Sequence, residues 1–410
     1  MQLIGPFTQL LPMDGLPAKG PIRDDMLPVI CHGGILVHNG FVQAIGDFQQ
    51  LKAQYNPAEI EHINGDYVAL PGMIDVHTHI CWAGSRANDY AMRVAGKSYL
   101  EIAASGGGIW DTVQKTRLAS LSQLTELTVQ RANKLLDQGI TTIEIKSGYG
   151  LSTEHELKML KAIAQANTQT QADLVATCLA AHIKPKDFEG SEEHYLAYIA
   201  NDLLPVVMQQ GLAKRVDIFV EKSAFGVRAA TAYLQKAKEL GFSVVVHGDQ
   251  FTPGAAALAN QVGALSIDHL EAADDHDIEL LAKGHTIPVV LPGASLGLGE
   301  PFAPARRLLD AGTSLVIASD WNPGSAPMGN LLTQAAVLGA VQRLSIAETL
   351  AALTVRAALA LNLPDRGILK NGCLADFIAF PTDNYQEILY QQGGLKPGRV
   401  WKKGRKAVSS

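Results

Sequence analysis

Cysteine, basic charge and long apolar runs are all scarce in this sequence. Its four cysteines lie far apart with no Cys-x-x-Cys spacing, which argues against a disulfide framework and favours reduced thiols. Acidic residues outnumber basic ones and give a net charge of −6, which argues against a nucleic-acid partner. No apolar run reaches about 18 residues, and the first residues lack the basic and apolar stretches of a signal peptide. We therefore expect a cytoplasmic protein without a membrane span.

The middle of the chain alternates apolar β-type runs with helical stretches. The chain has 410 residues, 47% of them hydrophobic, which suffices for a barrel and a smaller second unit. The predicted strands lie at residues 70–79, 140–146, 174–182, 216–221, 243–249, 265–269, 286–291 and 314–320. Helical stretches at residues 122–138, 153–168, 227–240 and 345–361 separate several of them. This order predicts an α/β fold, a (β/α)8 TIM-like barrel with an insertion at residues 80–138. A doubly wound open sheet is the alternative, but no Gly-x-Gly-x-x-Gly follows a first strand.

Both ends of the chain have a β-rich texture. Asn39-Gly40 separates two apolar runs, and this dipeptide is a strong signal for a tight hairpin. Residues 367–380 and 400–401 repeat the texture near the C-terminus. We expect residues 1–69 and 366–410 to pair into one small β-sandwich domain, and residues 70–365 to form the barrel.

The first barrel strand ends in His77-Thr78-His79. Side chains alternate along a strand, so both histidines point to one side and can share a metal ion. Taken alone, the pair has the alternative interpretation of two surface histidines on an edge strand. However, four other predicted strands also end on ligand-type residues: His182, His247, His269 and Asp320. We interpret His77, His79, His247 and Asp320 as ligands of one divalent or trivalent metal ion, Zn or Fe.

Two nearby residues have alternative interpretations. Lys146 ends the second predicted strand, where a carbamylated lysine would bridge two metal ions. No second set of ligands is evident, so an ion pair or hydrogen bond is the preferred role. Cys81 closely follows the histidine pair and could be a soft metal ligand. On an apolar strand, a cysteine is more often a small core residue.

Three stretches of the sequence resemble the amidohydrolase superfamily and, within it, the imidazolonepropionase family. They are His77-Thr78-His79 with residues 83–86 and 105–109, Lys146-Ser147-Gly148-Tyr149-Gly150-Leu151 with residues 155–160, and residues 319–325. The resemblance spans residues 70–360. It implies the same four metal ligands and hydrolysis of the cyclic amide 4-imidazolone-5-propanoate to N-formimidoyl-L-glutamate in histidine degradation. It also implies substrate contacts at Arg86, Tyr149, His182, Gln250, Asn322, Gly324 and Ser325.

One stretch departs from the family pattern. Members commonly carry a bulky Phe-Tyr-type pair after the Leu-Pro-Gly turn. Here Leu291-Pro292-Gly293 continues into a Gly-rich stretch up to Gly299. We expect a looser loop at residues 293–299, and a smaller wall of the pocket.

The residues suggest a mechanism and allow a choice between related activities. Asp320 can carry the proton of a metal-bound water, and His269 can hydrogen-bond the water or oxyanion. Arg86 offers a planar fork for a substrate carboxylate.

Gln250 stands where deaminases of this fold usually carry Glu, and a neutral amide cannot move a proton, which favours a cyclic amidase. A third hypothesis is a non-catalytic scaffold with this fold. Such a protein need not keep four metal ligands and a base, and this sequence has them. A homodimer is a common state for such enzymes.

Overall fold

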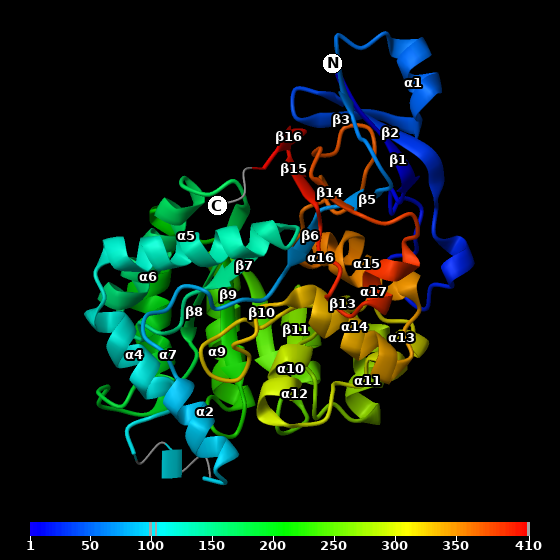
Figure 1. The fold of residues 1–410 in the computed structure, drawn as a ribbon. Coiled ribbons are helices and arrows are strands. Elements are labelled where there is room, and N and C mark those ends of the chain that lie inside the picture. The colour runs from blue at the N-terminus through cyan, green and yellow to red at the C-terminus, as the bar shows by residue number, and fades with distance from the viewer. Residues whose placement is uncertain (98–100, 103–104, 408–410) are drawn as a thin grey trace.

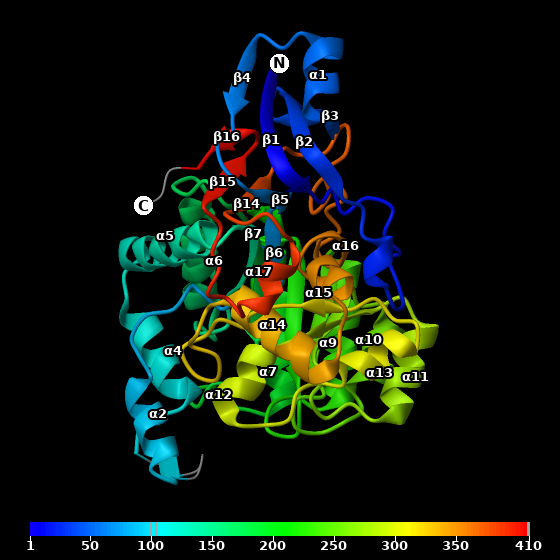
Figure 2. The same cartoon turned by 45° about the vertical axis from the view of Figure 1, so that its right-hand side comes forward.

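The computed structural model describes residues 1–97, 101–102 and 105–407, which form two eight-stranded sheets. One sheet combines both ends of the chain and stands at the top of Figure 1, and the other forms the barrel below it (Figures 1 and 2). The predicted fold class is confirmed. Residues 98–100 and 103–104 of the predicted insertion, and residues 408–410 of the predicted C-terminal part, lie outside the described residues.

The barrel strands pair in chain order, each parallel to the next. They are β6 (Met73–Asp75), β7 (Ile140–Lys146), β8 (Asp173–Ala181), β9 (Arg215–Val220), β10 (Ser243–Gly248), β11 (Ser266–His269), β12 (Ile287–Val290) and β13 (Val316–Ile317). All eight predicted strands are present. Beyond β6 and β13 the chain closes the barrel, because Asp320 N donates to His77 O at 3.0 Å and His79 N donates to Trp321 O at 3.0 Å. These bonds bring the first and last strand ends together.

Helices cover the barrel. They are α2 (Ala87–Val94), α4 (Ile109–Leu118), α5 (Leu121–Asp137), α6 (Thr153–Asn167), α7 (Glu192–Tyr198), η2 (Ile199–Leu203), α8 (Leu204–Gln209), α9 (Val227–Glu239), α10 (Ala255–Val262), α11 (Asp275–Lys283), α12 (Pro292–Leu298), α13 (Ala305–Asp310), α14 (Leu331–Gln342), α15 (Ile346–Leu353) and α16 (Val355–Ala360). The single helical stretch predicted at 345–361 is two helices. Thr354 has non-helical φ −130° and ψ −97°, and its hydroxyl donates back to Leu350 O at 2.6 Å. Such side-chain bonds compete with the helix.

The terminal sheet has the order β16-β15-β14-β5-β1-β2-β3, with β4 also paired to β1. Its strands are β1 (Gln2–Leu10), β2 (Ile30–His38), β3 (Phe41–Asp47), β4 (Glu59–His62), β5 (Val68–Pro71), β14 (Phe377–Phe380), β15 (Arg399–Lys402) and β16 (Arg405–Lys406). The predicted hairpin is confirmed, since Asn39 and Gly40 have φ of 50° and 86° between β2 and β3. The rings of Phe7 and Trp401 lie 6.1 Å apart although their strands are three positions apart, so the sheet curls around its own core. The division at residues 69/70 and 365/366 stays a prediction.

The terminal sheet connects directly to the barrel. β14 pairs antiparallel with β5, and Gly72 N, directly after β5, donates to Asp376 O at 2.9 Å. A Cβ atom at Gly72 would lie 2.3 Å from the Thr141 hydroxyl, so glycine is required where the chain passes from one sheet to the other. The C-terminal strand therefore supports the segment that leads into the His-x-His pair.

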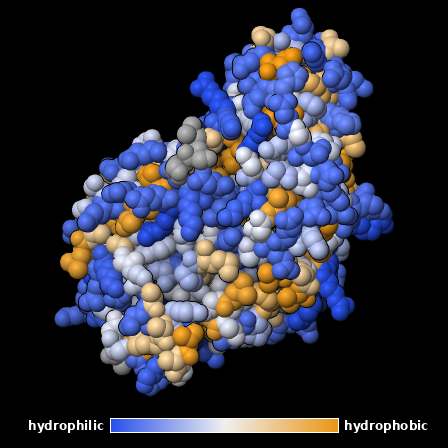
Figure 3. Space-filling model, in the orientation of Figure 1, coloured by the Kyte–Doolittle hydropathy of each residue, from blue (hydrophilic) through white to orange (hydrophobic). Residues whose placement is uncertain are grey.

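The remaining elements lie on the N- and C-terminal segments: η1 (Asp24–Met26), α1 (Phe48–Tyr55) and α17 (Gln386–Tyr390). None of the helices within the described ranges is long and apolar enough to cross a membrane. The face in Figure 3 is mostly hydrophilic with scattered apolar patches, because most large apolar side chains are buried in the cores.

Candidate active site

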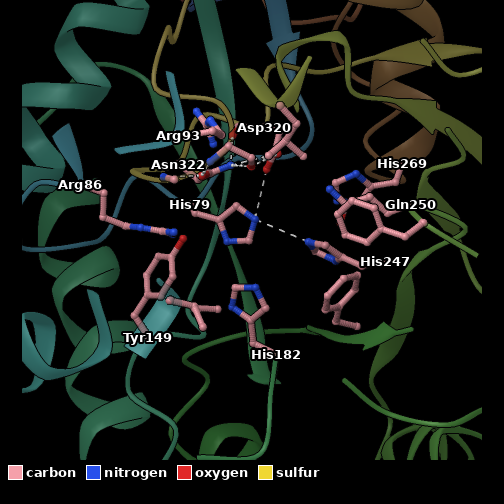
Figure 4. A pocket seen from close by; sticks show the side chains of 16 residues that line it. His79, Arg86, Arg93, Tyr149, His182, His247, Gln250, His269, Asp320 and Asn322 are labelled. Carbon is pink, nitrogen blue, oxygen red and sulfur yellow. Dashed lines mark hydrogen bonds and ion pairs between the residues drawn. The ribbon is translucent and has the colours of Figure 1, made fainter. Parts of the chain in front are cut away.

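Three imidazoles and one carboxylate meet at the carboxyl end of the barrel. His79 Nε2 lies 3.3 Å from His77 Nε2 and 3.5 Å from His247 Nε2. Asp320 Oδ1 lies 3.5 Å from His77 Nε2. The same oxygen lies 3.4 Å from His79 Nε2 (Figure 4). The four residues that sequence predicts as ligands are therefore brought together.

The spacing of these atoms fits a single metal ion. Ligand atoms about 2.0–2.1 Å from a tetrahedral zinc ion stand about 3.3–3.4 Å from one another, close to the four separations found here. Burial lowers the pKa of His79 and of His247 to about 3, and that of His77 well below its ordinary value. The imidazoles are thus neutral, and the three histidines form a group that could hold a metal ion.

Carboxylates orient two of these imidazoles from behind. His77 Nδ1 lies 2.6 Å from Asp268 Oδ2, and His247 Nδ1 lies 2.8 Å from Asp217 Oδ2. A proton on each Nδ1 leaves the Nε2 lone pair free for a metal ion, which is a common arrangement around ligating histidines.

Lys146 is fully buried among carboxylates. Its Nζ lies 2.8 Å from Asp217 Oδ2 and 3.0 Å from Glu144 Oε1. Burial lowers the pKa of Lys146, but Asp217 and Glu144 raise it more, so that the pKa stands above its ordinary value and the ammonium is charged. This is the ion pair preferred from the sequence. Cys81 is buried against Met159 O at 3.8 Å, and burial raises its pKa to about 11, as expected for a core thiol.

Asn322 fixes the Asp320 carboxylate. Its Nδ2 donates to Asp320 Oδ2 at 2.9 Å, while its Oδ1 accepts from the amides of Gly324 and Ser325 at 2.7 and 2.8 Å. The amides of this turn are therefore engaged within it. Asp320 itself has φ 50°, a left-handed conformation that few non-glycine residues adopt.

A cavity of about 200 Å³ opens beside this group. It is lined by His79, Arg86, Arg93, Ile109, Tyr149, His182, Phe219, His247, Gln250, Phe251, His269, Leu298, Asp320, Asn322, Gly324 and Ser325. All seven residues predicted to contact substrate are among them, and so is His269. In Figure 4 the two guanidinium groups approach from the side opposite His269 and Gln250. The size of the cavity limits its ligand to a small molecule. The two arginines in its lining favour an anionic ligand.

Arg86 is held in place on both sides. Its Nε donates to Asp89 Oδ2 at 2.7 Å, and the same oxygen accepts from Gly108 N at 2.8 Å, which ties α2 to the Gly-rich segment before α4. A Cβ atom at Gly324 would lie 2.2 Å from Arg86 Nη1, so glycine lets the guanidinium lie against the backbone. Arg93, two turns further along α2, also lines the cavity.

Glu156 fixes the turn that carries Tyr149. Its buried carboxylate accepts from the amides of Gly148, Gly150 and Leu151 at 3.1, 2.7 and 2.7 Å. Burial raises the pKa of Tyr149 above its ordinary value, so its hydroxyl remains a donor.

His182 is held against the same turn and is neutral. Its Nδ1 lies 3.1 Å from Gly148 O, which assigns the proton to Nδ1 and leaves Nε2 as an acceptor. Burial, with His79, lowers its pKa to about 3. His182 therefore presents an acceptor beside the Tyr149 donor.

Gln250 and His269 form the opposite wall. The Glu221 carboxylate accepts from the amides of Phe251 and Thr252 at 2.9 and 3.1 Å, which holds the loop bearing Gln250. His269 Nδ1 lies 3.4 Å from Glu271 Oε2. Burial lowers the pKa of His269, but Glu271 raises it more, and the pKa stands above its ordinary value.

The predicted loop at residues 293–299 is wrong, because residues 292–298 form the helix α12. A Cβ atom at Gly297 would lie 1.6 Å from Ser325 O, and one at Gly293 would lie 2.5 Å from Ser319 O. The two glycines lie one helical turn apart and let α12 seat directly on the segment that carries Asp320. Packing forms this helix where the sequence suggests a flexible stretch.

The sequence did not single out several residues that build this site. Arg93 and Phe219 line the cavity, and Asp217, Glu221 and Glu271 position its side chains. Asp268 directly precedes His269 at the end of an apolar strand, and Glu156 lies within the motif at residues 155–160, so both positions offered a usable signal. Arg93 gave none, since one arginine on an amphipathic helix usually faces solvent.

Residues 68–407 match the model described as the amidohydrolase family. Among solved structures, an adenosine deaminase from Xanthomonas campestris with bound zinc has a TM-score of 0.71 at 19% identity, covering 99% of this chain and 92% of that chain. An atrazine chlorohydrolase from Arthrobacter aurescens TC1 complexed with zinc has a TM-score of 0.70 at 16% identity, covering 99% and 95%. These likenesses show the fold. The chain belongs to the amidohydrolase family and is a hydrolase.

Curated relatives narrow this assignment. An imidazolonepropionase of Bacillus mycoides (strain KBAB4) is 38% identical over 98% of this chain and 95% of the relative. That of Bacillus cytotoxicus (strain DSM 22905 / CIP 110041 / 391-98 / NVH 391-98) is 37% identical over 99% and 96%. Within the amidohydrolases, the chain is thus a member of the imidazolonepropionase family.

Proposed function

We propose that this protein hydrolyses 4-imidazolone-5-propanoate to N-formimidoyl-L-glutamate, with one zinc or iron ion held by His77, His79, His247 and Asp320. The observation that carries the proposal is the close approach of three buried imidazoles and of Asp320 Oδ1 to two of them, beside a small cavity with two guanidinium groups. Curated relatives named imidazolonepropionase support the choice of substrate.

The chain's own residues supply the acid–base steps. When bound, the metal ion would polarise the ring carbonyl and lower the pKa of a water molecule towards neutrality. Asp320 accepts a proton from the attacking water and returns it to the ring nitrogen as the C–N bond of the cyclic amide breaks. His269, on the opposite wall, donates a hydrogen bond to the oxygen that becomes negative. The single product of this ring opening carries every atom of the substrate and of the water.

The remaining wall residues bind and orient the substrate. Arg86 pairs with the propanoate carboxylate in a fork-shaped contact, and Tyr149 donates beside it. His182 accepts through Nε2, and the Gln250 amide hydrogen-bonds the ring. A neutral Gln250 favours opening of a cyclic amide over deamination, which the adenosine deaminase fold would otherwise allow.

The decisive experiment combines elemental analysis with turnover. Purified full-length protein is expected to contain one metal ion per chain, zinc or iron, and to open imidazolone propanoate. It should leave adenine, cytosine and guanine unchanged. Deamination of any of these bases, or two metal ions per chain, would contradict the proposal. Its cytoplasmic location and homodimeric state remain predictions, which cell fractionation and light scattering can check.

A further inference from the structure

Lys146 connects two of the proposed metal ligands without touching either. Asp217 Oδ2 lies 2.8 Å from Lys146 Nζ and 2.8 Å from His247 Nδ1. Asp268 Oδ2 lies 2.6 Å from His77 Nδ1 and 3.6 Å from the same Nζ. The Lys146 ammonium group therefore lies next to both carboxylates that orient the two imidazoles, and all of these side chains are buried.

The strand that carries Lys146 also holds the backbone between the first two ligands. Lys146 N donates to Thr78 O at 2.9 Å, and the Thr78 hydroxyl donates to Glu144 O at 2.6 Å. Thr78 stands between His77 and His79. β7 thus fixes the His-x-His segment through its backbone and the imidazole supports through one side chain.

Asp217 and Asp268, together with His247, could form a second cation site. Ligand atoms of Asp217, His247 and Asp268 lie close enough to hold a metal ion. The Lys146 ammonium stands among them, with Glu144 Oε1 3.0 Å away. A fixed positive charge at this point balances oxygens that would repel one another in a buried setting or attract a second ion.

We propose that Lys146 is a positioning residue that takes the place of a second cation and holds Asp217 and Asp268 so that His247 and His77 present Nε2 to one metal ion. The proposal rests on the metal ligands of the proposed function and is independent of the substrate. It goes beyond an ion pair that only stabilises the fold, because it predicts an effect on metal affinity.

The test is zinc affinity, measured on the full-length chain by competition with a chelator. Lys146→Met keeps the length of the side chain and removes its charge. Loss of an outer support typically lowers metal affinity by about 10- to 100-fold, and a loss of that size is expected here. Lys146→Arg, which keeps the charge, should lose less. Zinc affinity of Lys146→Met equal to that of the wild type would overturn the proposal.

Lys402 provides a matched control. It is also buried, and its Nζ bridges Asp173 at 2.9 Å and Asp376 at 2.5 Å next to the terminal sheet. Lys402→Met should lower stability while leaving zinc affinity unchanged. An equal loss of zinc affinity in both variants would show a general effect of removing a buried lysine and would overturn the role proposed for Lys146.

Two further measurements keep the outcome decisive. If Lys146→Met does not fold, the double variant Lys146→Met/Glu144→Gln removes one positive and one negative charge and allows the same titration. Intact mass should show an unmodified Lys146 with one zinc per chain, and a carbamylated lysine with two would overturn the proposal. A wild-type protein that binds one zinc but does not open imidazolone propanoate would refute the proposed substrate alone.

Discussion

Individual residues of the site are held in conformations and environments that only the surrounding fold can maintain. Asp320 and His269 both adopt positive φ, 50° and 95°, which costs free energy for non-glycine residues. Hydrogen bonds from Asn322 fix the first of them, and Glu271 lies beside the second. These two side chains are therefore held in place before any ligand arrives, and single substitutions should separate the roles proposed for the residues of the site.

Arg86→Met should abolish most activity on imidazolone propanoate and have much less effect on an uncharged imidazolone. The reason is that a buried carboxylate needs a fixed cation to offset its desolvation. Steady-state kinetics on both substrates measures this difference. Arg93→Met is the matched control in the same cavity, with a smaller loss expected. A reversed order of losses would transfer the carboxylate contact to Arg93.

Asp320→Asn should reduce turnover more than metal content. An amide oxygen can remain near the imidazoles, but the amide cannot accept a proton at neutral pH. Activity and metal content are measured on one preparation. Near-normal turnover in this variant would remove Asp320 from the proton-transfer step.

Among elements, the barrel strands were predictable and α12 was not. Several barrel strands are short apolar runs that end on a polar residue, so the position of the strand and its site residue are visible together, as with His247 after residues 243–246. α12 contains Gly293 and Gly297, which are poor helix formers, and only its contact with the Asp320 segment explains why it is helical. Arg93 escaped prediction for a similar reason, because the closure of α2 over the cavity is a tertiary feature.

Gly297→Ala should lower kcat/KM on the order of 10- to 100-fold, since displacing reacting groups by about 1 Å has effects of this size. The new Cβ atom would collide with Ser325 O, so α12 or the Asp320 segment must move. Gly226→Ala is the control, because it stands at φ −74° with open space around it. Unchanged kinetics in Gly297→Ala would show that α12 can shift without disturbing the site.

The junction of the N-terminal segment with α15 should be sensitive to acid. Glu348 accepts from Ile22 N at 3.1 Å and from Arg306 Nη1 at 2.9 Å. Burial raises the pKa of Glu348, but the hydrogen bonds from Arg306 and from the amides of Ser345 and Ile22 together lower it more, so the folded pKa lies below its ordinary value. This stabilisation is present above the unfolded pKa of about 4.3 and is lost as the pH falls through the folded value.

Glu348→Gln should therefore lower the free energy of unfolding at pH 7 by about 2 kcal/mol, the range for hydrogen bonds to charged groups. The difference from the wild type should shrink on going to pH 3. Denaturant unfolding at both pH values measures it. A difference that grows towards low pH would contradict the sign.

At the scale of the whole molecule, Trp401 joins the two chain ends. It is fully buried, its ring stacks on Phe377 at 4.6 Å and meets Phe7 edge-on, and its Nε1 donates to Glu61 at 3.2 Å. The terminal sheet is thus one core built from both ends. Strand β5 of this sheet leads through Gly72 into the His-x-His segment.

Trp401→Ala should lower the free energy of unfolding by about 3–5 kcal/mol, as for other large core truncations. Trp401→Phe keeps an aromatic ring in the core but loses part of the indole volume and the bond to Glu61, so a loss smaller than that of Trp401→Ala is expected. Denaturant unfolding of the two variants gives both values. Equal losses would show that the hydrogen bond, and not the ring packing, holds the ends together.

The pairing of β5 with β14 has a consequence for how the protein is made. A ribosome releases β5 and the His-x-His segment early, whereas β14 and β15 are synthesised some 300 residues later. Throughout that interval β5 has a free edge on one side, and Gly72 lacks its partner at Asp376. The segment that leads into the His-x-His pair thus gains its support on this side only when the last strands are made, and a chain that stops short of them carries an unpaired strand edge.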